Sequence, residues 1–204
     1  MSGPEVRTMS HPVNPRGRRP FHELLADRKG QLDKPHYPEQ VAAIVAALVD
    51  AFRNGNKVLW FGNGGSAADA QHLAAEFSGR FLRERKGLPS EALSVNTSAV
   101  TAIANDFGYK QLFARMVEAM AKPGDVVVGI TTSGTSKNVV RGLEAARAAG
   151  ATTVAFTGNG GGPVADVSDL VLIGPDGYSA IVQEVHITMG HIICDLVEQE
   201  LIFR

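Results

Sequence analysis

Short apolar segments rich in β-branched residues alternate with longer segments of helical periodicity along most of this 204-residue chain. Continuous apolar runs are typical of parallel strands buried on both faces, whereas a helix repeats its apolar stripe about every 3.6 residues. We expect strands at 57–61, 91–95, 125–130, 152–157 and 169–173. Helical spacing predicts helices at 38–54, 67–82, 98–104, 109–121, 137–149 and 179–202. The alternation predicts an α/β fold, a three-layer α/β/α sandwich around a five-stranded parallel sheet.

The beginning of the chain differs in composition from the rest. Residues 1–20 contain four prolines together with Arg16, Arg18 and Arg19, and such a segment cannot build a packed core. We expect a mobile, solvated tail there rather than an arm that binds nucleic acid. The predicted division is an N-terminal tail with a short helix over 1–37 and a single domain over 38–204.

Charge and cysteine content restrict the partners and the location of the protein. The formal net charge is −1, whereas binding to nucleic acid requires a large cationic surface that neutralises phosphates. Cys194 is the only cysteine, so no internal disulfide can form, which favours a reducing compartment. The N-terminus has no apolar signal region, and we expect no membrane span. The sequence predicts a cytoplasmic protein with neither nucleic acid nor membrane as a partner.

Three predicted strands lead into loops of small polar residues, FGNGGSAAD, TTSGTSKN and TGNGGGP. In a parallel sheet these loops lie at the carboxyl edge, where ligands bind. Hydroxyls of Ser66 and of residues 131–136 lie where the first N–H groups of a helix lack partners, and this arrangement suits a phosphate. Glycine-rich turns also form for geometric reasons alone, so GNGGS is equally compatible with a plain turn, and we interpret TGNGGGP as one. The first loop has neither the Walker A nor the dinucleotide spacing, so no nucleotide cofactor is indicated.

Four polar side chains lie in segments that otherwise resemble apolar helices: His72, Glu76, Gln183 and His191. A spacing of four places His72 and Glu76 on one helix face, and a spacing of eight brings His191 round to roughly the side of Gln183. Glu184, seven residues before His191, aligns slightly better, so spacing leaves this choice open. A surface contact between His72 and Glu76 is the alternative interpretation. If the two helices meet, one pocket would hold an acid, a base and candidate metal ligands.

Taken together, these motifs resemble those of one family. The segments that carry the resemblance are GNGGSAADAQHLAAEFSGRF, TAIANDFGY, PGDVVVGITTSGTSKNVV and GYSAIVQEVHITMGHIICDLVE. They are similar to segments of the phosphoheptose isomerases, or sedoheptulose 7-phosphate isomerases, of the sugar isomerase (SIS) domain superfamily. The resemblance runs from about residue 38 to the C-terminus and implies a flavodoxin-like SIS fold. It implies interconversion of sedoheptulose 7-phosphate and D-glycero-D-manno-heptose 7-phosphate through a cis-enediol, the first step of nucleotide-activated heptose synthesis.

The resemblance also implies roles for individual residues. Glu76 and His191 match the acid–base pair, and we favour His191 as the base and Glu76 as the acid. The ligands of the zinc ion that some members hold, one per subunit, match His72, Glu76, Gln183 and His191, which favours Gln183 over Glu184. The positions that match substrate- or phosphate-binding residues are Asn63, Gly64, Gly65, Ser66, Arg80, Asn105, Asp106, Thr131, Thr132, Ser133, Ser136 and Gln183.

Partners follow from the same resemblance. It implies a phosphorylated seven-carbon sugar as the substrate and a homotetramer with its sites at subunit interfaces. Some members of the superfamily are non-catalytic, such as a protein that binds the replication initiator DnaA, and a sugar-phosphate sensor is a further alternative. The DnaA-binding protein has other residues at the positions of Glu76 and His191, and both are present here, which favours the enzyme.

Overall fold

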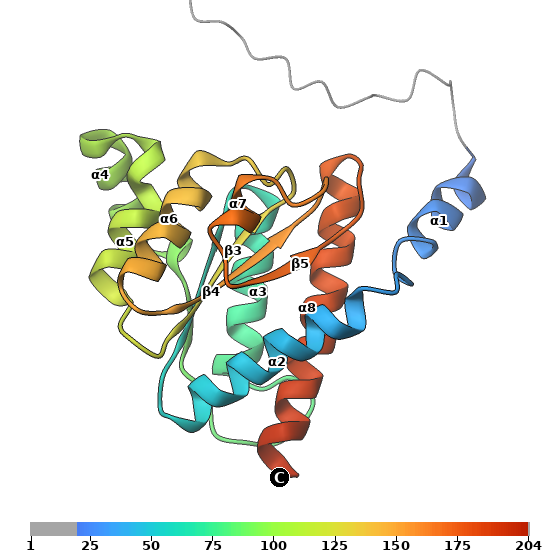
Figure 1. The fold of residues 1–204 in the computed structure, drawn as a ribbon, viewed down its shortest axis with the longest axis horizontal. Coiled ribbons are helices and arrows are strands. Elements are labelled where there is room, and N and C mark those ends of the chain that lie inside the picture. Colours follow the sequence, from blue (N-terminus) through green and yellow to red (C-terminus); the bar gives the residue numbers. More distant parts are fainter. Residues whose placement is uncertain (1–19, 204) are drawn as a thin grey trace, which may run out of the picture.

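The structure, a computed structural model, describes residues 20–203, so the tail expected over the first 20 residues lies almost wholly outside it. Five parallel strands form one sheet in the order β2-β1-β3-β4-β5 (Figure 1). The strands are β1 (Val58–Gly62), β2 (Ser90–Ala92), β3 (Val126–Thr131), β4 (Thr152–Thr157) and β5 (Leu170–Ile173). This order is that of a flavodoxin-like doubly wound sheet. The predicted α/β class with five parallel strands is confirmed.

Helices cover both faces of the sheet, as Figure 1 shows. One layer consists of α2 (Tyr37–Arg53), α3 (Gly65–Ser78) and α8 (Ser179–Ile202). The other consists of α4 (Thr97–Phe107), α5 (Leu112–Met120), α6 (Lys137–Ala148) and α7 (Pro163–Asp166). Two short 3-10 helices, η1 (Leu93–Val95) and η2 (Tyr109–Gln111), flank α4. Helix α1 (Phe21–Lys29) has no buried residue and extends from the body of the domain. The predicted domain boundary at residues 37 and 38 lies at the start of α2 and stays a prediction.

The sheet separates two hydrophobic cores. Successive side chains of a strand point to opposite faces, and the strands supply apolar residues to both. Trp60 and Phe156 pack with α2, α3 and α8, whereas Phe61 and Ala155 pack with α5 and α6. Burial on both faces explains why the strands are continuous apolar runs in the sequence.

Two predicted elements end several residues before their patterns indicated. The strand expected at 91–95 ends at Ala92, and the chain continues as η1. The helix expected to reach residue 82 ends at Ser78. There the guanidinium of Arg85 donates hydrogen bonds to carbonyls of the last helical turn. These bonds replace the backbone N–H donors that a longer helix would supply.

Helix α8 is the one helix among residues 20–203 whose length and composition would allow it to cross a membrane. In this fold 44% of its most apolar window is buried, and it packs against α2 and α3. A long core helix has the same composition as a span, so α8 is weak evidence for one.

His186 lies on α8 with its side chain completely buried. Its Nε2–H donates to the carbonyl of Thr157 at 2.9 Å, and its Nδ1 has no hydrogen-bond partner within the described part of the chain. Burial lowers the pKa of His186 to about 4, although the hydrogen bond to Thr157 acts in the opposite direction. The imidazole is therefore neutral in the folded chain near neutral pH.

We expect His186→Gln to reduce the loss of stability on acidification. Between the unfolded pKa of 6.5 and the folded pKa of about 4, the unfolded chain binds a proton that the folded chain does not. This residue alone should cost the wild type about 2 kcal/mol of unfolding free energy between about pH 7 and about pH 5. Urea unfolding at both pH values, in wild type and variant, measures the difference. Equal losses in the two proteins would contradict this prediction.

Candidate active site

A cavity of about 180 Å³ lies at the carboxyl edge of the sheet, between the ends of β1 and β3 and the first turn of α8. Its lining residues are Asn63, Ser66, Ile130, Thr131, Thr132, Ser133, Ser136, Ser179 and Gln183. Six of these nine residues carry a hydroxyl, and none carries a carboxylate. Helices α3 and α6 begin beside this cavity, and the free N–H groups and dipole of a helix N-terminus attract an anion. The cavity therefore suits a phosphate group.

Hydroxyl groups in the loop after β3 hold one another in place. Thr131 Oγ1 lies 3.0 Å from Ser136 Oγ, and Thr132 Oγ1 lies 3.0 Å from Ser179 Oγ at the start of α8. Gly134 in this loop has a φ of 68°, and a Cβ at that position would lie 2.0 Å from the carbonyl oxygen of Gly161. The loop after β4 thus supports the hydroxyl-rich loop and requires glycine at this contact.

Asn63 is held at the cavity by an amide pair. Its Nδ2 donates to Oδ1 of the buried Asn138 at 2.9 Å, and Nδ2 of Asn138 donates back at 2.8 Å. The hydroxyl of Tyr109 also donates to Oδ1 of Asn63, at 2.9 Å. Because Tyr109 follows α4 directly, this hydrogen bond ties the α4 segment to the cavity.

A second group of polar side chains lies further along α3 and α8. His72 Nε2 lies 3.1 Å from a carboxylate oxygen of Glu76 and 2.9 Å from Nε2 of His191. One ligand atom from each residue lies within 4.8 Å of the other two. The side chains of His72 and Glu76 are 49% and 24% exposed, so solvent or a substrate can reach them. We call these three residues the His-Glu-His cluster.

The donor set of this cluster is compatible with zinc. Two imidazole nitrogens and a carboxylate oxygen are common zinc ligands, and ligand atoms around a tetrahedral zinc ion lie about 3.4 Å apart. The measured separations of 2.9 and 3.1 Å are close to that value. Three protein ligands would leave a fourth position for water or a substrate oxygen.

Gln183 does not join the cluster within one chain. It lines the cavity, and its side chain covers Gly65, where an added Cβ would lie 2.6 Å from Nε2 of Gln183. Eight residues of α8 separate Gln183 from His191, which corresponds to about 12 Å along the helix axis. The structure brings His72, Glu76 and His191 together, whereas zinc ligation by Gln183 stays a prediction.

The other predicted site residues lie around these two centres. Gly64 and Gly65 form the start of α3, beside the cavity. Arg80 lies just after α3, with its Nε 3.9 Å from Glu84. Asn105 and Asp106 are exposed at the end of α4, where Asn105 Nδ2 donates to Asp106 Oδ1 at 2.9 Å. Their predicted contacts with a sugar are not tested by this geometry.

The sequence patterns did not single out four residues that border these centres: Asp69, Tyr109, Asn138 and Ser179. Ser179 begins the last helix at the sheet edge, a position that could have suggested a ligand contact. Asp69 precedes His72 by one turn, and its buried Oδ2 has no hydrogen-bond partner among residues 20–203. Burial raises the pKa of Asp69 to about 6, and the nearby His72 acts in the opposite direction.

Known proteins are similar to this chain in both sequence and fold. The SIS domain family matches residues 34–158. A phosphoheptose isomerase from Aquifex aeolicus is 53% identical over 163 residues, which cover 80% of this chain and 85% of that protein. Among solved structures, the phosphoheptose isomerase of Neisseria gonorrhoeae has a TM-score of 0.80 and 36% identity, and covers 88% of this chain and 100% of its own.

A phosphoheptose isomerase from Francisella tularensis is similar to the same extent. Its structure has a TM-score of 0.82 and 33% identity, with 88% of this chain and 95% of that chain covered. Identity of this level over nearly the whole length of the relatives establishes common family membership. The chain therefore belongs to the phosphoheptose isomerase family of SIS domain proteins.

Proposed function

We propose that the cavity and the His-Glu-His cluster are the two ends of one active site, which isomerises sedoheptulose 7-phosphate to D-glycero-D-manno-heptose 7-phosphate. The observation that carries this proposal is that Gln183 borders the cavity and His191, eight positions further along α8, belongs to the cluster. Helical rise over eight positions is about 12 Å, which is comparable with the length of an extended seven-carbon sugar phosphate. The cavity suits the phosphate at C7, and the cluster suits the reacting carbons C1 and C2.

Family membership supports the reaction itself. The chain is an aldose–ketose isomerase of the phosphoheptose isomerase family, because its relatives match it at about 50% identity over most of its length. The alternatives, a non-catalytic DnaA partner or a sugar-phosphate sensor, are not favoured. Both Glu76 and His191 are present, and both lie in the His-Glu-His cluster.

The reaction requires proton transfer at adjacent carbons. Conversion of the ketose to the aldose removes a proton from C1 and adds one to C2, while O1 loses a proton and O2 gains one. We assign His191 as the base at C1 and Glu76 as the acid at the neighbouring carbon. The distances within the cluster allow this, since both groups lie within reach of one small substrate.

Phosphate binding at the far end would orient the sugar. Hydroxyls of Thr131, Ser133 and Ser136, with Ser66 at the start of α3, offer hydrogen bonds to phosphate oxygens. Binding energy from a remote group can hold the reacting carbons against the cluster. We assign Asn63, Arg80, Asn105 and Asp106 to the sugar hydroxyls or the rim of the site, as the family pattern implies.

We also propose one zinc ion per chain, held by His72, Glu76 and His191. The family pattern also implies Gln183 as a ligand, which in the proposed assembly would belong to a neighbouring subunit. When bound, the ion would polarise the substrate carbonyl and so stabilise negative charge on its oxygen. The residues that hold it would also be fixed in orientation by it, which limits the rotation of both imidazole rings.

Substitution of the acid–base pair should abolish turnover. Glu76→Gln and His191→Ala are each expected to lower kcat with sedoheptulose 7-phosphate by about 10²- to 10⁴-fold, because each removes a proton carrier. Formation of the aldose measures the rate. Glu118→Gln, at an exposed position on α5, is the matched control and should retain full activity. A folded wild type that forms no aldose when supplied with zinc would contradict the proposed function.

Zinc content provides a separate test. Protein purified without chelators should contain about one zinc ion per chain, and His72→Ala should lose it, because a three-residue ligand set cannot spare an imidazole. Elemental analysis of both proteins gives the ratio. Metal-free wild-type protein with full activity would remove zinc from the proposal.

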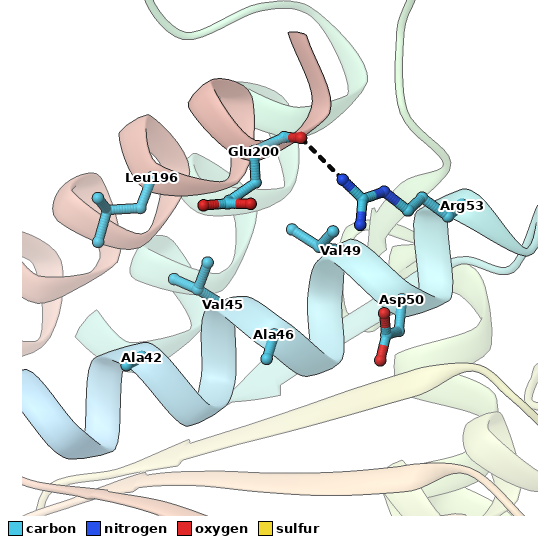
Figure 2. A pocket seen from close by; sticks show the side chains of 8 residues that line it. All are labelled: Ala42, Val45, Ala46, Val49, Asp50, Arg53, Leu196 and Glu200. Carbon is cyan, nitrogen blue, oxygen red and sulfur yellow. Dashed lines mark hydrogen bonds between the residues drawn. The ribbon is translucent and has the colours of Figure 1, made fainter. Parts of the chain in front are cut away.

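The predicted homotetramer has support from one apolar surface. A groove of about 410 Å³ lies between α2 and α8, and Figure 2 shows the apolar and charged side chains that line it. A second groove of about 380 Å³ adjoins it. Both grooves are bordered by Ala42 and Leu196, and the second includes Ile192, which is 42% exposed beside His191.

We expect a tetramer in solution, as the family resemblance implies, and burial of this surface between copies would remove it from water. Light scattering after size-exclusion chromatography measures the mass. A monomeric mass at micromolar concentration would contradict the assembly proposal and leave no role for sites at subunit interfaces. A cytoplasmic location, proposed from the single buried cysteine, is compatible with such an enzyme.

A further inference from the structure

The segment that follows α3 is hydrogen-bonded to one buried carboxylate, that of Glu198. Glu198 on α8 has no exposed side-chain surface. Its two oxygens accept hydrogen bonds from the backbone N–H groups of Phe81, Leu82 and Arg83, at 2.9, 3.0 and 2.9 Å. Because three consecutive N–H groups donate to one carboxylate, the backbone conformation of this segment is restricted.

Arg85 connects the same carboxylate to the end of α3. Its Nε donates to Glu198 at 2.9 Å, and its Nη atoms donate to the carbonyls of Glu76 at 2.8 Å and Phe77 at 2.9 Å. The planar guanidinium thus compensates the buried charge and satisfies carbonyls that the helix end leaves without partners. Burial opposes ionisation, but the backbone hydrogen bonds and Arg85 prevail and lower the pKa of Glu198.

One side chain of this fixed segment reaches the His-Glu-His cluster. The ring of Phe81 stacks on the imidazole of His191, with centroids 5.5 Å apart and planes inclined by 22°. His191 also meets His72, whose ring centroid is 4.9 Å away. The His191 ring therefore contacts both an aromatic ring of the fixed segment and another member of the cluster.

We propose that Phe81 is a positioning residue for His191, and that Glu198 and Arg85 hold Phe81 in the place where it can stack. The Phe81 ring restricts the rotation of the imidazole, so that its Nε2 stays directed at the cluster. Correct orientation of a proton carrier matters because small misplacements of reacting groups reduce rates strongly. This inference rests on the proposed function for its effect on catalysis, but the contact itself can be measured without turnover.

The decisive comparison uses Phe81→Leu, which keeps an apolar side chain and removes the aromatic face. We expect kcat with sedoheptulose 7-phosphate to fall by about 10- to 100-fold, the usual range for loss of a residue that orients a ligand or proton carrier. KM should change by less than about threefold, because the phosphate cavity is not touched. Phe81→Tyr, which retains the ring, should restore kcat to near the wild-type value.

Phe52→Leu is the matched control. It removes a ring from the same core, where Phe52 contacts Phe77, without contact to His191. It should lower the thermal midpoint of unfolding and leave kcat unchanged. An equal fall of kcat in Phe52→Leu and Phe81→Leu, or an unchanged kcat in Phe81→Leu, would overturn the inference.

Arg85→Lys tests the support beneath Phe81. Lysine keeps a positive charge beside Glu198 but cannot also bridge to the carbonyls of α3, so we expect kcat to fall in the same direction. A wild-type kcat in this variant would overturn the part of the inference that assigns Arg85 to hold Phe81.

NMR spectroscopy of protein with ¹³C-labelled histidine separates this inference from the proposed function. The ring protons of His191 should be shielded by Phe81 in the wild type and move downfield in Phe81→Leu. An unchanged His191 signal would overturn the positioning role even if the enzyme is active. If the wild type shows no turnover but the His191 signal still differs between wild type and Phe81→Leu, the proposed reaction is contradicted and the contact is supported.

Discussion

The site depends on how closely α3 and α8 approach each other. Gly190 lies against Leu73, and a Cβ at position 190 would lie 2.7 Å from both Cδ atoms of that leucine. Without a side chain there, the two helices pack near enough for the neighbouring residues, His191 and His72, to meet at 2.9 Å. A larger residue would separate the helices, because packed interiors have no spare volume to absorb it. The functional cluster is thus a consequence of a packing contact directly behind it.

Three contacts at successive positions along α3 and α8 give these helices regions with different roles. At the sheet edge, Gln183 lies over Gly65 and borders the hydroxyl-lined cavity. In the middle His72 and His191 meet, and at the far end Glu198 holds the segment after α3. Groups placed on regular helices keep their separations better than groups on loops. The distance between the cavity and the cluster is therefore fixed by helical rise.

The sequence predicts angular relations on these helices better than axial ones. Strand positions and the α/β class follow from continuous apolar runs, because burial on both faces imposes them directly. An eight-residue spacing aligns Gln183 with His191 in angle, but it also separates them by about 12 Å in height, and periodicity alone does not weigh that distance. Sequence periodicity also does not predict the early end of α3, because that end depends on Glu198, more than a hundred residues away. The role of a side chain such as Asn138 can be inferred only once its hydrogen-bond partner, here Asn63, is known.

Helix α4 is held by fewer buried contacts than the elements that carry the two ends of the proposed site. The cavity and the cluster lie on elements that contribute to the hydrophobic cores, whereas α4, which carries Asn105 and Asp106, has no buried residue. Its link to the cavity includes the hydrogen bond from Tyr109 to Asn63. An element held by few buried contacts opens at low cost in free energy. If α4 opens at low cost beside the cavity, a flexible sugar chain can enter there, while the cavity and the cluster keep their separation on α3 and α8.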